Sequence, residues 1–388
     1  MNIALCFENV NPARGGCETY IADLMRRLVA DGHTVHLYGC RCETAALPAA
    51  MTFHRLSVPR GPRFLRPWRF AAACERALAA NRHDVSVGFD KTWGQDVLYP
   101  QGGLHAASAD HNIRKHASPL VRGLARLAKR CDLAARSFAR LERKQYFENR
   151  PTIIVNSEMV AGHFRHYHGV PAERLHVIRS AIDPNRFHSA DRLRVRAEWR
   201  ERWRLRPEEP AGLFVAMNYR LKGLEPLLHA VALVPHDRPF RLVVVGHSKT
   251  ARYERLARRL GVADRVVFHG FCAETRNAYF AGDFLVHPTF YDPCSLVALE
   301  ALACGLPVIT SRYNGASELL NPPYDGLVID DPHDHRQLAD CLVRMCDAEY
   351  RADAGPAARE AAGRWTFEQH YRRMIQVFTD VAARKQAA

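Results

Sequence analysis

The chain has 388 residues, of which 47% are hydrophobic and 25% are charged. This composition is ordinary for a globular protein and excludes a disordered or fibrous chain, and the length suits about two domains. No apolar run approaches the roughly 18–20 residues that span a bilayer, and the first residues look like a β-strand rather than a secretory signal peptide. The net charge of +14 favours polyanionic partners such as nucleic acid, anionic lipid or a phosphorylated substrate.

The amino-terminal half alternates apolar runs with helical segments, which predicts an α/β domain. Helices are expected at about 17–31, 67–80 and 158–168, and strands at 2–7, 34–38, 53–58, 85–89 and 152–155. Gly15 and Gly16 open the first helix, so the backbone there can approach a ligand closely. The pair lacks the G-x-G-x-x-G dinucleotide fingerprint, and an ordinary turn is the alternative interpretation.

A long basic helix is expected over residues 112–150. Its apolar residues recur at a spacing of three to four and mark one face: Leu120, Leu124, Leu127, Cys131, Ala134, Phe138 and Leu141. The other face carries Arg122, Arg126, Lys129, Arg130, Arg136, Arg140, Arg143 and Lys144. A cationic amphipathic helix can lie on an anionic membrane surface. The alternative is a helix that packs its apolar stripe on the domain and leaves the charges in water.

The carboxyl-terminal half gives the clearest pattern. Residues 176–191, with Pro184 in an Asp-Pro-Asn turn, are expected to link the two halves. Short β-rich runs follow at 212–217, 241–246, 265–270, 284–288, 306–310 and 326–330, with helix-like stretches between them. Buried, branched strands alternating with helices predict a doubly wound parallel sheet, whose ligand lies at the carboxyl ends of the strands.

The segment 287–310 carries the most informative motif. A strand is expected to end at its start, a loop follows that includes Cys294, and a helix begins at Ser295. Free backbone N–H groups at Ser295, Leu296 and Val297 would then form an anion site suited to a phosphate.

Two carboxylates accompany this predicted anion site. Asp292 and Glu300 stand eight positions apart, one in the loop and one in the helix. Carboxylates readily accept paired hydrogen bonds from sugar or ribose hydroxyls. On spacing alone, a helix cap at Asp292 and a solvated charge at Glu300 explain the pair equally well.

This stretch resembles the donor-binding signature of glycosyltransferase family 4, retaining enzymes of the GT-B fold in which two acids stand eight positions apart. The resemblance implies that Asp292 contacts the hexose hydroxyls and that Glu300 binds the ribose. The first acid of the family is usually Glu, so Asp at this position bears on the identity of the donor sugar. Residues 215–228 resemble the family loop whose lysine contacts the diphosphate, which implies that role for Lys222. Met217 stands where the family usually has an arginine, and Arg220 is the expected substitute.

Further segments fit the same family. Residues 85–108 resemble bacterial lipopolysaccharide core glucosyltransferases, and the resemblance implies that His105 faces the donor hexose, with a buried structural histidine as the alternative. Asp90, Lys91 and Asp96 are weaker candidates for binding the acceptor. The glycine loop at Gly15 and Gly16, residues 166–187 and the terminal segment 364–378 match the family as well.

The resemblance implies a GT-B architecture: two Rossmann-like, doubly wound α/β domains facing across a cleft. We expect an acceptor-side domain over 1–180, a nucleotide-sugar domain over 181–365 and a terminal helix, 366–388, that packs back on the first domain. The implied reaction moves a hexose from a UDP-sugar, such as UDP-glucose, to a membrane glycolipid such as a lipopolysaccharide core. The resemblance also implies that no cofactor and no metal are required, which agrees with the missing Asp-x-Asp pair of metal-dependent transferases.

The expected catalytic residues are His105, Asp292 and Lys222. The expected donor-binding residues are Gly15, Gly16, Arg220, Lys222, Asp292, Cys294, Ser295, Leu296, Val297 and Glu300. The basic helix would place the enzyme in the cytoplasm, on the inner face of the membrane. A GT-B nucleotide-sugar epimerase and a transferase to a soluble acceptor are alternatives, and a nucleic-acid-binding protein is a remote one because no reading motif is present.

Overall fold

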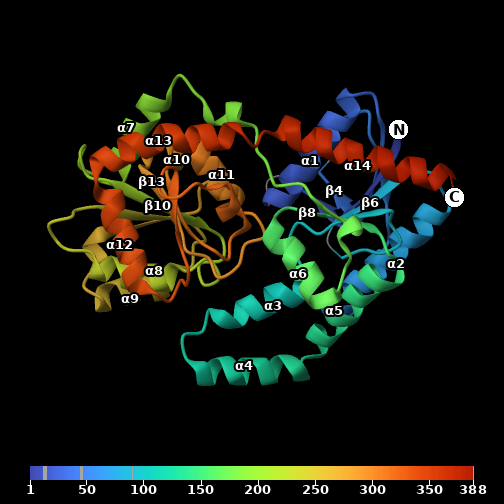
Figure 1. Cartoon of the computed structure of the whole chain (residues 1–388), viewed down its shortest axis with the longest axis horizontal. Helices are drawn as coiled ribbons and strands as arrows, with labels where there is room; N and C mark the ends of the chain where they lie inside the picture. The colour runs from blue at the N-terminus through green and yellow to red at the C-terminus, as the bar shows by residue number, and fades with distance from the viewer. Residues whose placement is uncertain (12–14, 44–46, 90, 388) are drawn as a thin grey trace. The chain divides into compact units, whose positions relative to one another are not determined.

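The computed structural model describes residues 1–11, 15–43, 47–89 and 91–387, which form two compact units (Figure 1). The first unit contains Met1–Asp110, Pro119–Arg179 and Gln369–Ala388, and the second contains His111–Ser118 and Ser180–Glu368. Each unit has its own parallel sheet, so the expectation of two doubly wound α/β units is confirmed.

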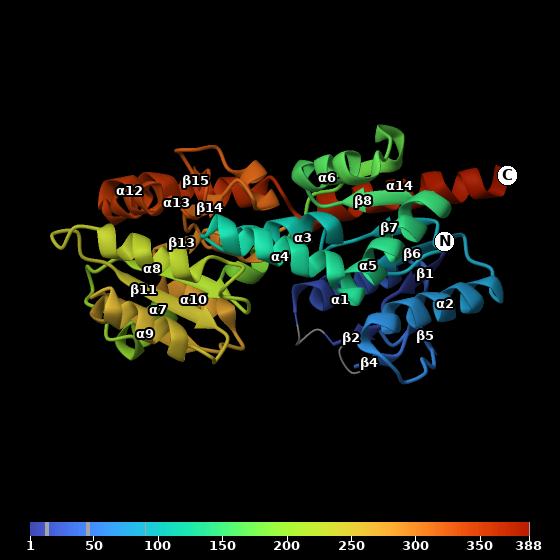
Figure 2. The same ribbon diagram turned by 90° about the horizontal axis from the view of Figure 1, so that it is seen from below.

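The first unit is built on a seven-stranded sheet. Its strands are β1 (Asn2–Cys6), β3 (Thr34–Gly39), β5 (Thr52–Arg55), β6 (Val85–Phe89), β7 (Val97–Tyr99), β8 (Thr152–Val155) and β9 (Leu175–Val177). They lie in the order β5-β3-β1-β6-β7-β8-β9, and every neighbouring pair is parallel. Figure 2 shows β1, β6, β7 and β8 in this sheet. The central strands are almost wholly buried because helices cover both faces.

Helices and short elements complete the first unit. The helices are α1 (Gly16–Ala30), α2 (Arg66–Ala79), α3 (His105–Arg114, to Asp110 in this unit), α4 (Pro119–Cys131), α5 (Leu133–Arg143), a π-helix (Lys144–Glu148), α6 (Glu158–His168) and α14 (Phe367–Ala387). Short 3-10 turns cover Arg63–Leu65 and Ala172–Arg174, and β2 (Asn9–Val10) pairs with β4 (Arg41–Cys42).

The second unit is built on a six-stranded sheet. Its strands are β10 (Ala211–Ala216), β11 (Arg241–Gly246), β12 (Val266–Gly270), β13 (Phe284–His287), β14 (Val308–Ser311) and β15 (Gly326–Ile329), in the order β12-β11-β10-β13-β14-β15. Its helices are α7 (Arg192–Arg202), α8 (Leu224–Leu233), α9 (Ala251–Arg259), α10 (Thr275–Ala281), α11 (Leu296–Ala303), α12 (His335–Cys346) and α13 (Ala348–Gly363), with 3-10 turns at Pro184–Phe187, Ala263–Arg265 and Gly315–Leu319.

Alternate residues of one strand show how this second sheet is covered. Leu213 and Val215 of β10 pack in a core with α7, α10, α11 and α13, whereas Phe214 and Ala216 pack in a second core with α8, α9 and α12. Because successive side chains of a strand point to opposite faces, the sheet is buried on both sides. The carboxyl ends of its strands are left to carry loops, where the sequence predicts the ligand.

The single helix expected over 112–150 is wrong. The first part of that segment belongs to α3, α4 begins at Pro119, and α5 begins after Asp132. Proline suits only the first turn of a helix, because it has no backbone N–H. Asp132 accepts a hydrogen bond from the backbone N–H of Ala134 at 2.8 Å and caps α5. The apolar spacing continues through both breaks, so periodicity alone missed them.

The carboxyl-terminal helix α14 is part of the core of the first unit. His370 lies between two partners there: its Nε2 is 2.7 Å from the Tyr20 hydroxyl of α1, and its Nδ1 is 2.8 Å from the Arg179 carbonyl. A carbonyl only accepts, so Nδ1 carries the proton and Nε2 accepts from Tyr20. Burial lowers the pKa of His370 to about 4, so this histidine is neutral at pH 7.

Candidate functional site

The loop after β13 brings together two of the residues that the sequence predicts for the site. Lys222 Nζ donates to Asp292 Oδ2 at 2.6 Å and to the Tyr291 carbonyl at 3.2 Å. The two side chains are 19% and 15% exposed, so the ion pair is shielded from most of the solvent. An ammonium group has three N–H donors, and these two contacts leave one of them for a ligand.

The surroundings of Asp292 keep its carboxyl ionised. Burial would raise the pKa of Asp292, but the Lys222 ammonium and the neighbouring His287 imidazole outweigh it and hold the pKa well below its ordinary range. His287 Nε2 lies 3.5 Å from Asp292 Oδ2, and burial lowers the pKa of His287. The site therefore presents a carboxylate, an ammonium and a neutral imidazole within one loop cluster.

Gly223 fixes the position of Lys222. Its φ is +84°, and a Cβ at this residue would lie 2.1 Å from the Pro288 carbonyl oxygen. Only glycine tolerates both the left-handed conformation and so close an approach of backbone. The loop that carries Lys222 is thus held against the loop that carries Asp292.

Asn314 holds the other side of the Asp292 loop, and no motif in the sequence predicts this role. It is fully buried, and its Oδ1 accepts from the backbone N–H of Ser295 at 3.1 Å and of Ala316 at 3.0 Å. Asp292 also pairs with this segment, since its N–H donates to the Tyr313 carbonyl and its carbonyl accepts from Gly315.

The contact with Asn314 corrects one expectation. The N–H of Ser295 is not free for a ligand, because Asn314 accepts it. Leu296 and Val297 begin α11, where helical geometry leaves N–H groups without an intrahelical partner. Cys294 is buried beside them, and burial raises the pKa of its thiol to about 12, so it is not a thiolate at neutral pH.

Glu300 lies one turn into α11 and is only partly exposed. Its Oε2 accepts from the hydroxyl of the fully buried Tyr279 at 2.7 Å. Burial raises the pKa of Glu300 to about 7, although the Tyr279 hydrogen bond and the charge of Arg186 act to lower it. Glu300 does not contact Lys222 or Asp292 through any hydrogen bond that the structure shows, and its carboxylate remains available as an acceptor near the start of α11.

Arg220 and the segment His111–Ser118 also belong to the second unit. Arg220 is exposed, and its Nη2 lies 3.0 Å from His116 Nδ1. His111 Nδ1 lies 3.1 Å from the Phe290 carbonyl, and its ring stacks on Tyr291 at 5.1 Å. The segment thus packs on the residues that precede Asp292, a contact that the sequence did not predict.

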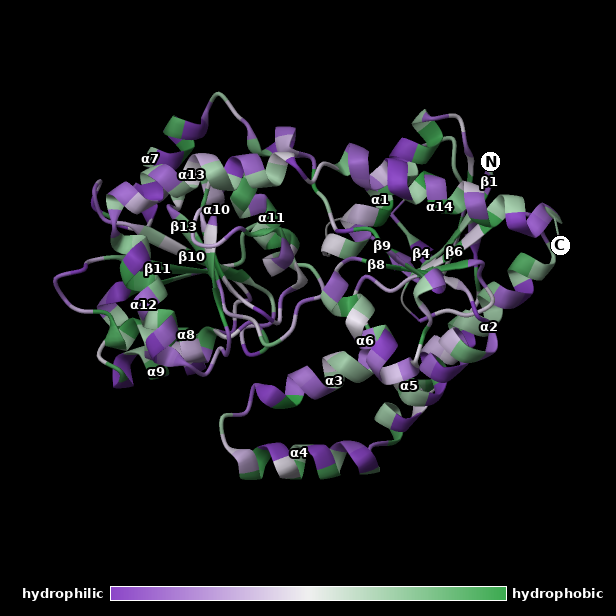
Figure 3. Ribbon diagram, viewed as in Figure 1, coloured by the Kyte–Doolittle hydropathy of each residue, from purple (hydrophilic) through white to green (hydrophobic). Residues whose placement is uncertain are grey.

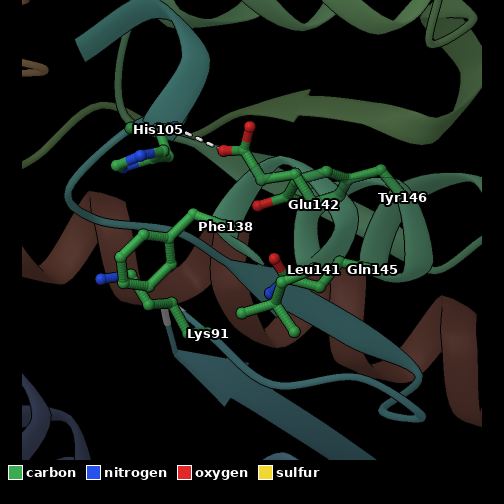
Figure 4. Close-up of a pocket in the computed structure, with 8 residues that line it drawn as sticks. Lys91, His105, Phe138, Leu141, Glu142, Gln145 and Tyr146 are labelled. Carbon is green, nitrogen blue, oxygen red and sulfur yellow. Dashed lines mark hydrogen bonds between the residues drawn. The ribbon is translucent and has the colours of Figure 1, made fainter. Parts of the chain in front are cut away.

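The remaining expected residues belong to the first unit. His105 starts α3 and lines a cavity of about 20 Å³, which has room for roughly one water molecule. The cavity is lined by Lys91, Gly103, His105, Phe138, Leu141, Glu142, Gln145 and Tyr146 (Figure 4). It is too small for a sugar ring.

Asp96 and the glycine loop lie apart from this cavity. The Asp96 carboxylate accepts from the backbone and hydroxyl of Ser86, at 2.8 and 2.7 Å, and from Lys385 Nζ at 3.0 Å. These bonds tie β6 to α14. Gly15 precedes α1 with an extended backbone, Gly16 is its first residue, and both are exposed. The candidate Asp90 falls outside the residues that the structure describes.

The helix α4 has no buried residue. Its apolar side chains Leu120, Leu124 and Leu127 are 82%, 67% and 60% exposed. Figure 3 shows hydrophobic and hydrophilic residues alternating along α4. Among the described residues, no helix is both long enough and apolar enough to cross a membrane. In the same part of the chain, no group of three or more His, Cys, Asp or Glu side chains is placed to hold a metal ion.

Comparison with known families assigns both halves of the chain. Residues 14–186 match the family described as "Glycosyltransferase Family 4", and residues 209–348 match "Glycosyl transferases group 1". The lipopolysaccharide glucosyltransferase WaaG of Escherichia coli (strain K12) is 26% identical over 346 residues, which cover 88% of each chain. A D-inositol 3-phosphate glycosyltransferase of Xylanimonas cellulosilytica is 26% identical over 399 residues, covering 96% of this chain and 93% of that protein.

Solved structures show the same fold. The crystal structure of WaaG, a glycosyltransferase involved in lipopolysaccharide biosynthesis, aligns with a TM-score of 0.79 at 22% identity and covers 97% of this chain and 99% of that chain. The structure of Anabaena Alr3699/HepE in complex with UDP and glucose aligns with a TM-score of 0.66 at 18% identity. The alignment covers 98% of this chain and 99% of that chain. The likeness extends over both units.

Proposed function

Because the chain is a glycosyltransferase that belongs to family 4 and has the GT-B fold, we propose that it transfers a hexose from a nucleoside diphosphate sugar with retention of configuration. The observation that carries this proposal is the Lys222–Asp292 pair beside the start of α11, because it puts a cation, a carboxylate and helix N–H groups within one loop cluster. UDP-glucose is the donor that we propose, since HepE has been crystallised with UDP and glucose and WaaG is named a glucosyltransferase.

Each residue of the second unit has a distinct proposed part in binding the donor. The remaining N–H of Lys222 and the amides of Leu296 and Val297 would bind the diphosphate, and the exposed guanidinium of Arg220 would add a second cation. Asp292 would accept hydrogen bonds from the hexose hydroxyls, and Glu300 from the ribose. Cys294 and Ser295 would shape the turn between these groups.

Catalysis would then depend on charge rather than on a side-chain nucleophile. Fixed cations and amides stabilise the charge that develops on the leaving diphosphate. Such electrostatic stabilisation of the transition state is usually the largest contribution to the rate enhancement. In the family model of retention, that diphosphate helps to activate the acceptor hydroxyl on the same face of the sugar. We propose that His105 faces the hexose, that Gly15 and Gly16 lie by the donor phosphates and acceptor, and that neither a metal nor another cofactor is required. The weaker acceptor candidates are Lys91, Asp90 and Asp96.

The acceptor that we propose is a membrane glycolipid of the lipopolysaccharide core type, reached from the cytoplasmic face. Support comes from the exposed apolar residues of α4 and the basic residues around them, since such a helix can lie in the interface of an anionic membrane. A soluble acceptor is the second candidate, because a D-inositol 3-phosphate glycosyltransferase matches 96% of the chain, against 88% for WaaG.

Slow hydrolysis of a panel of nucleotide sugars, with and without EDTA, tests the reaction. We expect UDP-glucose to be hydrolysed fastest, UDP to raise the melting temperature, and EDTA to have no effect. A protein that neither binds UDP nor hydrolyses any nucleotide sugar would overturn the proposal. A nucleotide sugar converted to its epimer would instead support the epimerase alternative.

Sedimentation with vesicles tests the membrane proposal. Reversing the exposed residues Arg126, Arg130, Arg140 and Arg143 to Glu should release the protein from vesicles that contain phosphatidylglycerol, because each basic residue near such a surface contributes about 1 kcal/mol. Raising the salt concentration should release the parent protein from the anionic vesicles. Vesicles of phosphatidylcholine alone should bind neither the parent nor the charge-reversed protein. Equal binding of the parent and the reversed protein to the anionic vesicles would show that these charges face only solvent.

A further inference from the structure

Glu142 of α5 is a buried carboxylate that binds the first turn of α3. It is only 5% exposed, and its oxygens accept from the backbone N–H of His105 at 2.5 Å and of Ala106 at 3.2 Å. His168 Nε2 lies 3.6 Å from the same carboxylate. A negative charge is stabilised at a helix amino terminus, where N–H groups lack intrahelical partners. The carboxylate of Glu142 therefore fixes the backbone of His105 to α5, in addition to the contacts within α3.

Phe138 lies one turn before Glu142 on the same face of α5. Its ring contacts the side chains of His105 and Lys91. Its ring centroid lies 4.8 Å from that of His105, and Lys91 Nζ lies 4.4 Å from the centre of the ring. Figure 4 shows Glu142 directed at the start of α3 and Phe138 beside both His105 and Lys91. Residues four apart on a helix share a face, so one helix provides both contacts.

The outward face of the same helix carries positive charge. Arg136, Arg140 and Arg143 are exposed, whereas Leu141 and Glu142 are buried. The cavity between α5 and His105 has a volume of about 20 Å³, so the side chains leave room for little more than a water molecule. A helix packed this closely transmits a displacement of its outer face to the residues on its inner face.

We propose that Phe138 and Glu142 are positioning residues that fix His105 and Lys91 for sugar transfer, so that α5, His105 and Lys91 move as one body. The inference rests on the proposed function, in which His105 faces the hexose and Lys91 the acceptor. It gives α5 a second role in addition to membrane contact. Docking of its outer face on a lipid surface would restrict the motion of His105.

The test compares side chains that keep or lose each contact. Phe138→Leu removes the ring and Glu142→Ala removes the carboxylate, whereas Phe138→Tyr keeps the ring and Glu142→Gln keeps an oxygen that accepts from the amides. Phe147→Leu and Glu148→Ala are the comparison variants, because both residues are exposed, and the Phe147 ring lies 5.5 Å from that of His168. The measurements are kcat and KM for UDP-glucose hydrolysis, UDP affinity by calorimetry, the melting temperature, and the imidazole nitrogen signals of ¹⁵N-histidine-labelled protein.

Loss of either contact should lower kcat by roughly 10- to 100-fold, because small displacements of a catalytic group have effects of this size. The affinity for UDP should stay within about twofold, and the His105 signal, assigned with His105→Asn, should shift. Phe138→Tyr and Glu142→Gln should restore most of kcat, and the two comparison variants should match the parent. A kcat that is unchanged in both Phe138→Leu and Glu142→Ala would overturn the inference.

Two further variants separate this inference from the proposed function. If His105→Ala lowers kcat while Phe138→Leu and Glu142→Ala do not, the positioning inference fails and the role of His105 stands. If His105→Ala leaves kcat unchanged in a protein that hydrolyses UDP-glucose, the role of His105 is wrong, and the positioning inference fails with it. Lys91→Ala gives the corresponding comparison for KM of the acceptor reaction.

Discussion

Lys222 and Asp292, seventy positions apart in the sequence, form an ion pair with 2.6 Å between Nζ and Oδ2. Lys222→Ala should lower the rate of sugar transfer by roughly 100-fold, because it removes the cation proposed to stabilise the leaving diphosphate. The fold should persist, since Asp292 keeps its backbone bonds to Tyr313 and Gly315. Steady-state kinetics and a melting curve check both statements. Normal turnover in Lys222→Ala would remove this residue from the proposed site.

The length of the acid at position 292 is proposed to select the donor sugar. Asp292→Glu restores the usual acid of the family and moves the carboxylate by about 1.5 Å, because the backbone on both sides is fixed. We expect the ratio of kcat/KM among UDP-glucose, UDP-galactose and UDP-N-acetylglucosamine to change. A donor preference identical to that of the parent would indicate that Asp292 serves only the loop structure.

Glu300 gives a pH dependence of defined sign. Its pKa is about 7 in the folded protein against an ordinary 4.5, so the folded state binds more protons between these values and loses stability as the pH rises through 7. Glu300→Gln should therefore be more stable than the parent at pH 8.5, by up to about 3 kcal/mol, and nearly equal to it at pH 4.5. Melting curves at both pH values measure this difference.

The same substitution should weaken UDP binding by about tenfold, because a neutral amide is a poorer acceptor for the ribose hydroxyls than a carboxylate. Calorimetry at pH 8.5 measures the loss. Unchanged affinity, with the expected gain in stability, would mean that Glu300 is buried for structural reasons alone.

The apolar face of α4 should matter for membranes and not for folding. Leu120→Ser, Leu124→Ser and Leu127→Ser together should weaken binding to anionic vesicles by at least about tenfold, because burial of each CH₂ group contributes about 0.8 kcal/mol. The melting temperature should not fall, since all three side chains are mostly exposed. Leu141→Ser is the matched control: this leucine is buried, and its loss should cost roughly 2–5 kcal/mol.

His370 predicts sensitivity of the first unit to acid. Its pKa is about 4 in the folded protein against an ordinary 6.5, so the unfolded chain binds the proton first and stability is lost as the pH falls from 6.5 towards 4. Between pH 6.5 and pH 4, the free energy of unfolding of His370→Gln should fall by about 3 kcal/mol less than that of the parent. Burial also lowers the pKa of His36, His54 and His83, but these are common to both proteins and cancel in the comparison. Stability curves of the parent and His370→Gln that run parallel against pH would contradict the prediction.

Most strands and the paired acids could be predicted because their signals are local, but the three-residue strands β7 and β9 were not predicted. Parallel strands buried on both faces are continuous apolar runs, and Asp292 and Glu300 keep a fixed spacing within one loop and helix. Asn314, Tyr279 and Glu142 could not be found in this way. Each makes hydrogen bonds to residues that are 19 or more positions away in the chain, and a lone Asn, Tyr or Glu has no pattern that marks it.

The break in the basic segment shows a different kind of error. Pro119 and Asp132 are ordinary signals for the start of a helix, and both were present in the sequence. The regular apolar spacing on its own favours one continuous helix and masks these two signals. The break has a physical effect, because it separates α4, which buries nothing, from α5, which buries Leu141 and Glu142.

The position of α14 affects how the protein is made in the cell. This helix supplies Tyr371, Met374 and Phe378 to the core of the first unit, yet a ribosome synthesises it after all of the second unit. Domains commonly fold as they emerge, the amino-terminal one first. Here the first unit must wait with part of its apolar surface uncovered until the last helix is released, so the second unit has the opportunity to finish folding before it. Chaperones that bind nascent chains would therefore be expected to occupy the amino-terminal unit for longer.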